Sequence, residues 1–109
     1  MERELRERIA ANEAAFREVN EGIARGHYPG EEDAPRGFRC ECARLGCNTM
    51  VELTAREYEQ IRAHSRHFVL APGHQLPDVE QVVETRDSYV VVEKIGQAGR
   101  LADESDPRG

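Results

Sequence analysis

The sequence contains no tryptophan, one lysine (Lys94) and only three cysteines. Its aromatic residues are three phenylalanines and three tyrosines, spread along 109 residues. A chain of this length forms one domain, and a domain this small buries only a thin hydrophobic core. A bound metal ion would therefore contribute more to the stability of this fold than it would to that of a large one.

Long apolar runs and an excess of positive charge are also missing. No stretch approaches the roughly 18 apolar residues that a membrane span requires. The charged N-terminus has no apolar segment of the kind found in secretory signals. The net charge of −6 argues against a general nucleic-acid binder, which normally carries a basic surface. We therefore expect a cytoplasmic protein with no membrane partner.

The three cysteines lie within eight positions, as Cys40, Cys42 and Cys47 in a C-x-C-x4-C pattern. An odd number of clustered cysteines fits metal ligation in a reducing compartment better than a disulfide framework. Thiolates are the usual ligands of structural zinc. Gly46 precedes the last cysteine and allows the positive φ that a metal knuckle often requires. The cluster predicts a zinc ion, with redox-active thiols as the alternative.

A tetrahedral zinc needs a fourth ligand from elsewhere in the chain. We choose His74, because the Pro72-Gly73 turn before it can hold its side chain toward the cysteines. His64, His67 and a water molecule are the alternatives.

No catalytic motif accompanies the predicted metal site. The chain has no H-E-x-x-H motif, no phosphate-binding glycine loop and no nucleophile elbow. Glu41 lies between two ligands, but we expect it to be a solvated surface carboxylate. Nothing in the sequence points to an enzyme, so a binding role is favoured over a catalytic one.

Residues 1–25 are predicted to form one amphipathic helix. Its inward positions follow a 4, 3, 4, 3, 4 spacing that forms a heptad seam: Leu5, Ile9, Asn12, Phe16, Val19 and Ile23. This seam packs on its own domain, pairs with a second copy or docks on a partner protein.

The remaining chain divides into a linker at 26–37, a zinc-stapled α+β domain at 38–96 and a flexible acidic tail at 97–109. Within the domain we expect two knuckle strands at 38–42 and 48–53. A short helix should follow, opened by Thr54 and a capping box with Glu57. Strands at 68–70, 79–85 and 89–95 should form a small antiparallel sheet, the last two as a hairpin.

Arginines cluster in the middle of the chain, and three of them flank the cysteines: Arg36, Arg39 and Arg44. They are candidate nucleic-acid contacts, but nearby glutamates favour an ordinary mixed surface.

The pattern as a whole resembles a group of small bacterial proteins. The similar segments are 11–13, 16–17, 20–21, 38–47, 57–58, 68, 72–74 and 89–96. This resemblance implies no substrate and no catalytic residue. The cysteines also resemble a zinc-ribbon knuckle, but depart from it in the C-x-C spacing and in lacking a fourth cysteine.

The sequence therefore predicts a small zinc-binding protein-interaction or regulatory module in which zinc is structural. A protein partner or self-association through the N-terminal helix would explain the seam. A nucleic-acid-binding zinc-ribbon-like protein and a thiol redox protein are the alternative functions.

Overall fold

The computed structural model describes residues 3–108. Met1, Glu2 and Gly109, at the outer ends of the predicted helix and tail, lie outside this range. The elements follow the order α1 (Arg3–Arg25), β1 (Pro35–Arg39), β2 (Met50–Thr54), α2 (Ala55–Arg62), β3 (His67–Leu70), β4 (Glu80–Thr85), β5 (Val90–Lys94) and α3 (Gly96–Glu104). Of the helices within residues 3–108, none combines the length and the apolar character needed to cross a bilayer.

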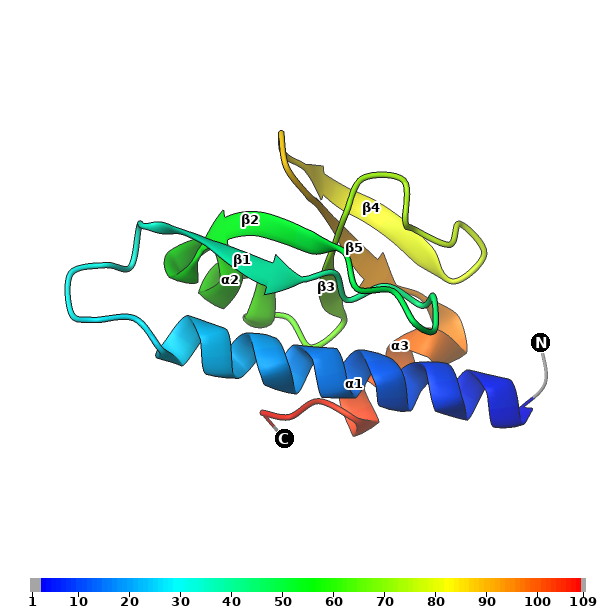
Figure 1. Cartoon of the computed structure of the whole chain (residues 1–109). Coiled ribbons are helices and arrows are strands. Elements are labelled where there is room, and N and C mark those ends of the chain that lie inside the picture. Colours follow the sequence, from blue (N-terminus) through cyan, green and yellow to red (C-terminus); the bar gives the residue numbers. More distant parts are fainter. Residues whose placement is uncertain (1–2, 109) are drawn as a thin grey trace.

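The strands form two small antiparallel sheets, which confirms the α+β prediction. β1 pairs with β2, and β3, β5 and β4 form a second sheet with β5 in the centre. The predicted hairpin between β4 and β5 is present, closed by a hydrogen bond of 2.8 Å from Arg86 N to Tyr89 O. α1 runs beneath both sheets along the length of the molecule (Figure 1).

The core lies between the sheets, α1 and α2. Phe38 of β1 stacks on Tyr58 of α2 with ring centroids 5.0 Å apart. Val90, Val91 and Val92 are buried in succession, because neighbouring elements cover both faces of the central strand. The predicted start of α2 is confirmed: Thr54 is its N-cap, and Glu57 completes the capping box.

The face of α1 that packs on the domain differs from the predicted seam. Its buried side chains are Glu13, Arg17, Asn20, Glu21 and Ala24. Of the seam residues, Leu5 is exposed and Val19 is 49% exposed, while the other four are half-buried. The inward face was therefore wrongly assigned at Leu5 and Val19, and the fully buried positions lie beside the seam, because the surface beneath α1 offers carbonyl groups and charged side chains as well as apolar ones. That the seam binds a partner stays a prediction.

The predicted flexible tail is wrong as well, because α3 occupies most of it. Ala102 is buried in the core, and residues beyond α3 are tied to the domain by ion pairs. Asp106 binds the buried Arg62, and Arg108 binds Glu21 and Glu59. The acidic composition suggested a solvated tail, but here the acids neutralise arginines of other elements.

The predicted linker is shorter than expected, because β1 already begins at Pro35. The loop before it is held to α2. Arg56 N donates to Glu32 O at 3.0 Å, and the Arg56 side chain pairs with Asp33 at 2.9 Å.

Candidate metal centre

Cys40, Cys42, Cys47 and His74 converge on one point although 34 positions separate the first from the last. Their candidate ligand atoms all lie within 4.8 Å of one another. His74 Nδ1 is 3.6 Å from the sulfur of Cys40 and 3.8 Å from that of Cys47. This group of four side chains could hold a metal ion.

Backbone hydrogen bonds fix the first cysteine of the cluster. Cys40 N donates to Thr49 O at 3.0 Å, so the hairpin continues one residue past β1. Ala71 N donates to the Cys40 sulfur at 3.1 Å. The next residue joins the other sheet, since Glu41 N donates to Val69 O at 2.8 Å. The cysteine segment therefore bridges the two sheets.

Two glycines shape the loops that carry the remaining ligands. Gly46 has φ +83° just before Cys47, as the sequence predicted. Gly73 has φ +86°, and His74 N donates to Ala71 O at 3.1 Å across the predicted turn. Positive φ is accessible to glycine without a steric penalty, so both turns can be tight enough to aim the following ligand at the cluster.

The thiols lie close enough to share protons. A hydrogen bond between Cys40 and Cys42 raises the pKa of Cys40 and lowers the pKa of Cys42 to about 4. Cys42 is therefore the member of the pair that loses its proton more readily. Thiolate is the form of cysteine that binds metals.

Glu41 is buried, which corrects the expectation of a solvated carboxylate. Its side chain reaches α1, α2 and β3. Its carboxylate accepts hydrogen bonds from Asn20 Nδ2 at 2.8 Å, from the Tyr58 hydroxyl at 2.6 Å and from Val69 N at 3.0 Å. Burial raises the pKa of Glu41. The residue joins α1, α2 and β3 immediately behind the metal centre.

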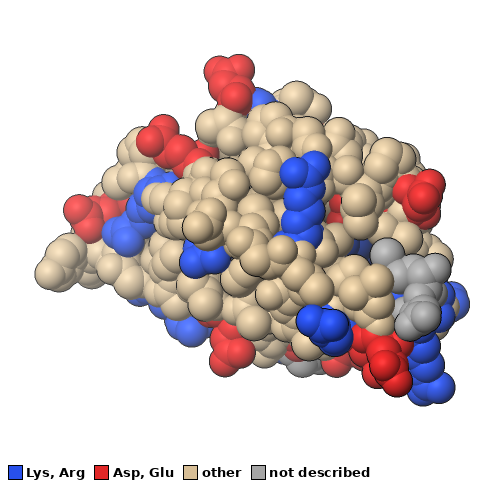
Figure 2. Space-filling model, turned by 45° about the vertical axis from the view of Figure 1, so that its right-hand side comes forward, with Lys and Arg blue, Asp and Glu red and all other residues tan. Residues whose placement is uncertain are grey.

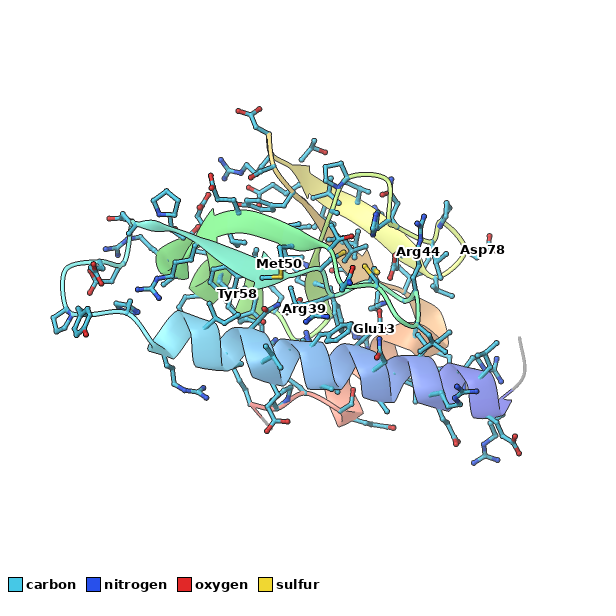
Figure 3. All side chains as sticks on the ribbon, viewed as in Figure 1. Glu13, Arg39, Arg44, Met50, Tyr58 and Asp78 are labelled. Atoms are coloured by element: carbon cyan, nitrogen blue, oxygen red, sulfur yellow. The ribbon has the colours of Figure 1, made fainter. Side chains whose placement is uncertain are left out.

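The three flanking arginines have different surroundings. Arg39 donates to Cys47 O at 3.3 Å and lies over the Phe16 ring, and Arg44 donates to Gly73 O at 3.4 Å. In the view of Figure 3, Arg39 lies between Tyr58 and Glu13, and Arg44 lies farther along, toward Asp78. Arg36 pairs with Glu31 at 3.6 Å. Two of the three candidate nucleic-acid contacts thus bind carbonyl groups of the ligand loops.

The rival histidines lie outside the cluster. His67 contacts Glu93 at 3.2 Å, and its ring is 4.4 Å from that of His64. The structure therefore brings His74 to the three cysteines, and it places neither His64 nor His67 there.

Sequence reasoning missed the polar residues that hold α1 in place. The Arg17 guanidinium is buried over the Phe68 ring, 3.8 Å from its centroid, and donates to the carbonyls of Ser65 and His67. Positions 13, 17, 20 and 24 repeat with helical spacing, but three of the four are polar. A search for apolar periodicity passes over such a face.

Comparison of the chain with models of protein families, with curated sequences and with solved structures finds no match. The geometry of the site is therefore the basis for assigning its chemistry. Three sulfurs and one imidazole provide four soft or borderline donors, which suit a transition metal better than magnesium or calcium.

Proposed function

We propose that the protein is a zinc-stapled interaction module in which zinc is structural. Four-coordinate zinc with three cysteines and one histidine is a common structural site. Bonds of about 2.3 Å to sulfur and about 2.0 Å to nitrogen, at tetrahedral angles, put these two atoms about 3.5 Å apart. The His74–sulfur distances of 3.6 and 3.8 Å support this geometry.

The donor set supports a structural role more than a catalytic one. A catalytic zinc keeps a coordination position open for water or substrate, and four protein ligands close it. The carboxylate nearest in sequence, Glu41, is already engaged by three donors, from α1, α2 and β3. It is thus not placed to act as a general base at the metal.

Exposed apolar side chains beside the ligands support a role in protein contact. Leu45 and Met50, on either side of Cys47 in the chain, are 43% and 50% exposed. Figure 2 turns toward the viewer the side of the molecule that lies to the right in Figure 1. Acidic side chains lie mostly toward the margins of this face, and basic ones stand singly within it. Leu45 and Met50 are exposed apolar side chains that a partner protein could bury.

The zinc proposal is tested by native mass spectrometry of freshly purified protein, before and after a zinc chelator. We expect one zinc per chain, and loss of the folded charge-state distribution when it is removed. A folded chain without metal and with three alkylatable thiols would refute a structural zinc and favour the redox alternative. The same spectra count the chains in the particle and so test self-association.

The contact proposal is tested by site-specific photocrosslinking in cells from a probe at Thr49. Crosslinked protein products should disappear in Met50→Asp and persist in Val83→Asp, a matched change of an exposed apolar residue on β4. Crosslinks to nucleic acid, or products unaffected by Met50→Asp, would refute a protein-docking face at the ligand loops.

A further inference from the structure

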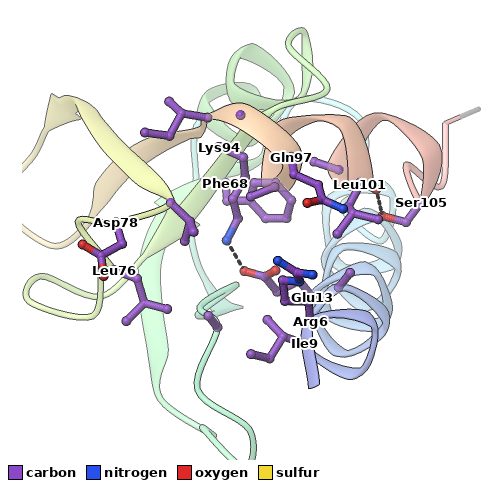
Figure 4. A pocket seen from close by; sticks show the side chains of 17 residues that line it. Arg6, Ile9, Glu13, Phe68, Leu76, Asp78, Lys94, Gln97, Leu101 and Ser105 are labelled. Atoms are coloured by element: carbon purple, nitrogen blue, oxygen red, sulfur yellow. Dashed lines mark hydrogen bonds and ion pairs between the residues drawn. The ribbon is translucent and has the colours of Figure 1, made fainter. Parts of the chain in front are cut away.

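A cavity of about 490 Å³ lies between α1, α3, the end of β5 and the loop before β4. Figure 4 shows Ile9 of α1, Leu76 of the loop and Leu101 of α3 around it. The wall is largely apolar. Small-molecule sites are typically cavities of about 300–1,000 Å³ that combine such walls with a few polar groups. No ligand of the proposed zinc lines this cavity, so it is a separate feature of the fold.

Three buried ionisable side chains cluster at one end of it, and two of them, Lys94 and Glu13, line the cavity. Lys94, at the end of β5, is 3% exposed and binds both Glu13 of α1 and Glu80 of β4. Two carboxylates thus share one ammonium group, which leaves a formal charge of −1. Glu80 is further engaged, since its other oxygen accepts from Leu76 N at 2.7 Å.

Glu13 can accept a further hydrogen bond. It binds Lys94 through Oε2 and lines the cavity. Among residues 3–108, no donor reaches its Oε1 within hydrogen-bonding distance. Burial raises the pKa of Glu13 to about 7, since few groups compensate the ionised form. A cation or a strong hydrogen-bond donor in the cavity would stabilise the ionised carboxylate of Glu13.

We propose that this cavity binds a small organic amine, whose apolar body fills the space between α1 and α3 and whose ammonium group donates to Glu13 Oε1. The cluster contains two carboxylates and one ammonium group, so it favours a ligand with a cationic head group. The apolar wall favours a ligand with a hydrocarbon body. This activity goes beyond the proposed zinc-stapled module and does not depend on which metal the cysteines hold.

The cavity also contains a feature that favours anions. α3 begins at Gly96 without a side-chain cap, and its first turn lines the cavity, with Arg6 on another part of the wall. A helix N-terminus contributes only about half a positive charge. The full positive charge of Arg6 is offset by the carboxylate of Asp78, which also lines the cavity. A carboxylate head group placed beside Lys94 would be repelled by the full negative charges of Glu13 and Glu80. The ammonium group of Lys94 is already bound to both of these carboxylates. The amine is therefore the better ligand.

The proposal is tested by calorimetric titration of the full-length, metal-loaded protein with hexylamine, hexanol and hexanoate. At about pH 8 Glu13 is ionised, so we expect hexylamine to bind most tightly and hexanoate least. Glu13→Gln should weaken hexylamine about tenfold and leave hexanol unchanged. Ala98→Phe, which fills the cavity from α3, should abolish binding of all three. Glu18→Gln, on the exposed face of α1, is the matched charge control and should change nothing.

Chemical-shift perturbation in the same titrations reports where each probe binds, and thermal melting shows that the variants are folded. Perturbations centred on Ile9, Leu76 and Leu101 support the proposal. Preference for hexanoate over hexylamine would assign the site to the N-terminus of α3 and overturn it. Absence of saturable binding to the wild type, or binding unaffected by Ala98→Phe, would overturn it too.

Discussion

Asn20 and Arg39 exchange two hydrogen bonds, as neighbouring strands do. Arg39 N donates to Asn20 Oδ1 at 2.7 Å, and Asn20 Nδ2 donates to Arg39 O at 2.9 Å. The side-chain amide of α1 thus completes the backbone of β1 one residue before the first cysteine. The same Nδ2 also reaches Glu41 at 2.8 Å. Asn20 therefore joins the helix to both of the residues that flank Cys40.

Asn20→Ala should lower the free energy of unfolding by about 3 kcal/mol, because it leaves several buried polar groups without partners. Asn12→Ala is the matched control on the same helix. Its buried Nδ2 has no partner among the described residues, so we expect a change below about 0.5 kcal/mol. Urea unfolding of the metal-loaded proteins measures both. Equal effects of the two substitutions would show that the Asn20 contacts are not made.

Cys42→Ser should remove the metal and unfold the domain, because a structural zinc contributes on the order of 10 kcal/mol in small folds. Metal analysis and circular dichroism of the purified variant measure the two effects. Leu45→Ser, an exposed change in the same loop, should retain both metal and fold. A Cys42→Ser protein that melts like the wild type would mean that the cluster does not stabilise the fold.

Tyr58→Phe should destabilise the protein by about 2 kcal/mol. It keeps the stack on Phe38 but removes the hydroxyl that donates to the buried Glu41. Tyr89→Phe removes a comparable hydrogen bond, from the Tyr89 hydroxyl to Glu57 at 3.0 Å. Glu57 is only half-buried, so the cost should be smaller. Denaturant midpoints compare the two variants, and a larger loss in Tyr89→Phe would contradict the buried network around Glu41.

Asp106→Asn should destabilise the fold by about 2–3 kcal/mol, because it removes the carboxylate nearest to the buried Arg62. Asp103→Asn is the control: Asp103 also pairs with an arginine, Arg66, but at the exposed surface. We expect little change there, because solvent screens exposed pairs. Thermal melting of both variants decides whether residues after α3 belong to the folded unit. Indistinguishable melting curves would mean that they do not.

Glu13→Gln should gain stability relative to the wild type as the pH rises. The pKa of Glu13 is raised from 4.5 to about 7 in the fold, so the native state holds a proton that the unfolded state has lost across this window. Between these two pKa values, the free energy of unfolding of the wild type therefore falls by up to about 1.4 kcal/mol per pH unit relative to that of the variant. Chemical denaturation of both proteins at several pH values measures the difference. A difference independent of pH would show that Glu13 titrates normally.

Much of the fold follows from local sequence signals. The capping box at Thr54 and Glu57 places the start of α2, and the turn at 86–88 places the β4–β5 hairpin, because both depend on residues close in the chain. The metal cluster was also predictable. Three of its ligands lie within eight residues, and the Pro72-Gly73 turn marked the fourth.

The face of α1 and the end of the chain could not be predicted in this way. Apolar spacing selected Val19 as an inward residue, whereas Arg17 and Asn20 are the ones buried. A buried polar residue is stable only if partners from other elements reach it. Those partners, such as the carbonyls of Ser65 and His67, lie far away in the sequence.

The sequence by itself determined the composition of the candidate metal centre, the positions of most secondary-structure elements and the thinness of the apolar core. These properties depend on residue type and on short-range spacing. Only the tertiary structure decided that Glu41 lies inside, that α3 replaces a solvated tail and that Glu13 faces a cavity beside Lys94. Each of these depends on charges that distant parts of the chain bring together, because burial of a charge is compensated by its partners in space.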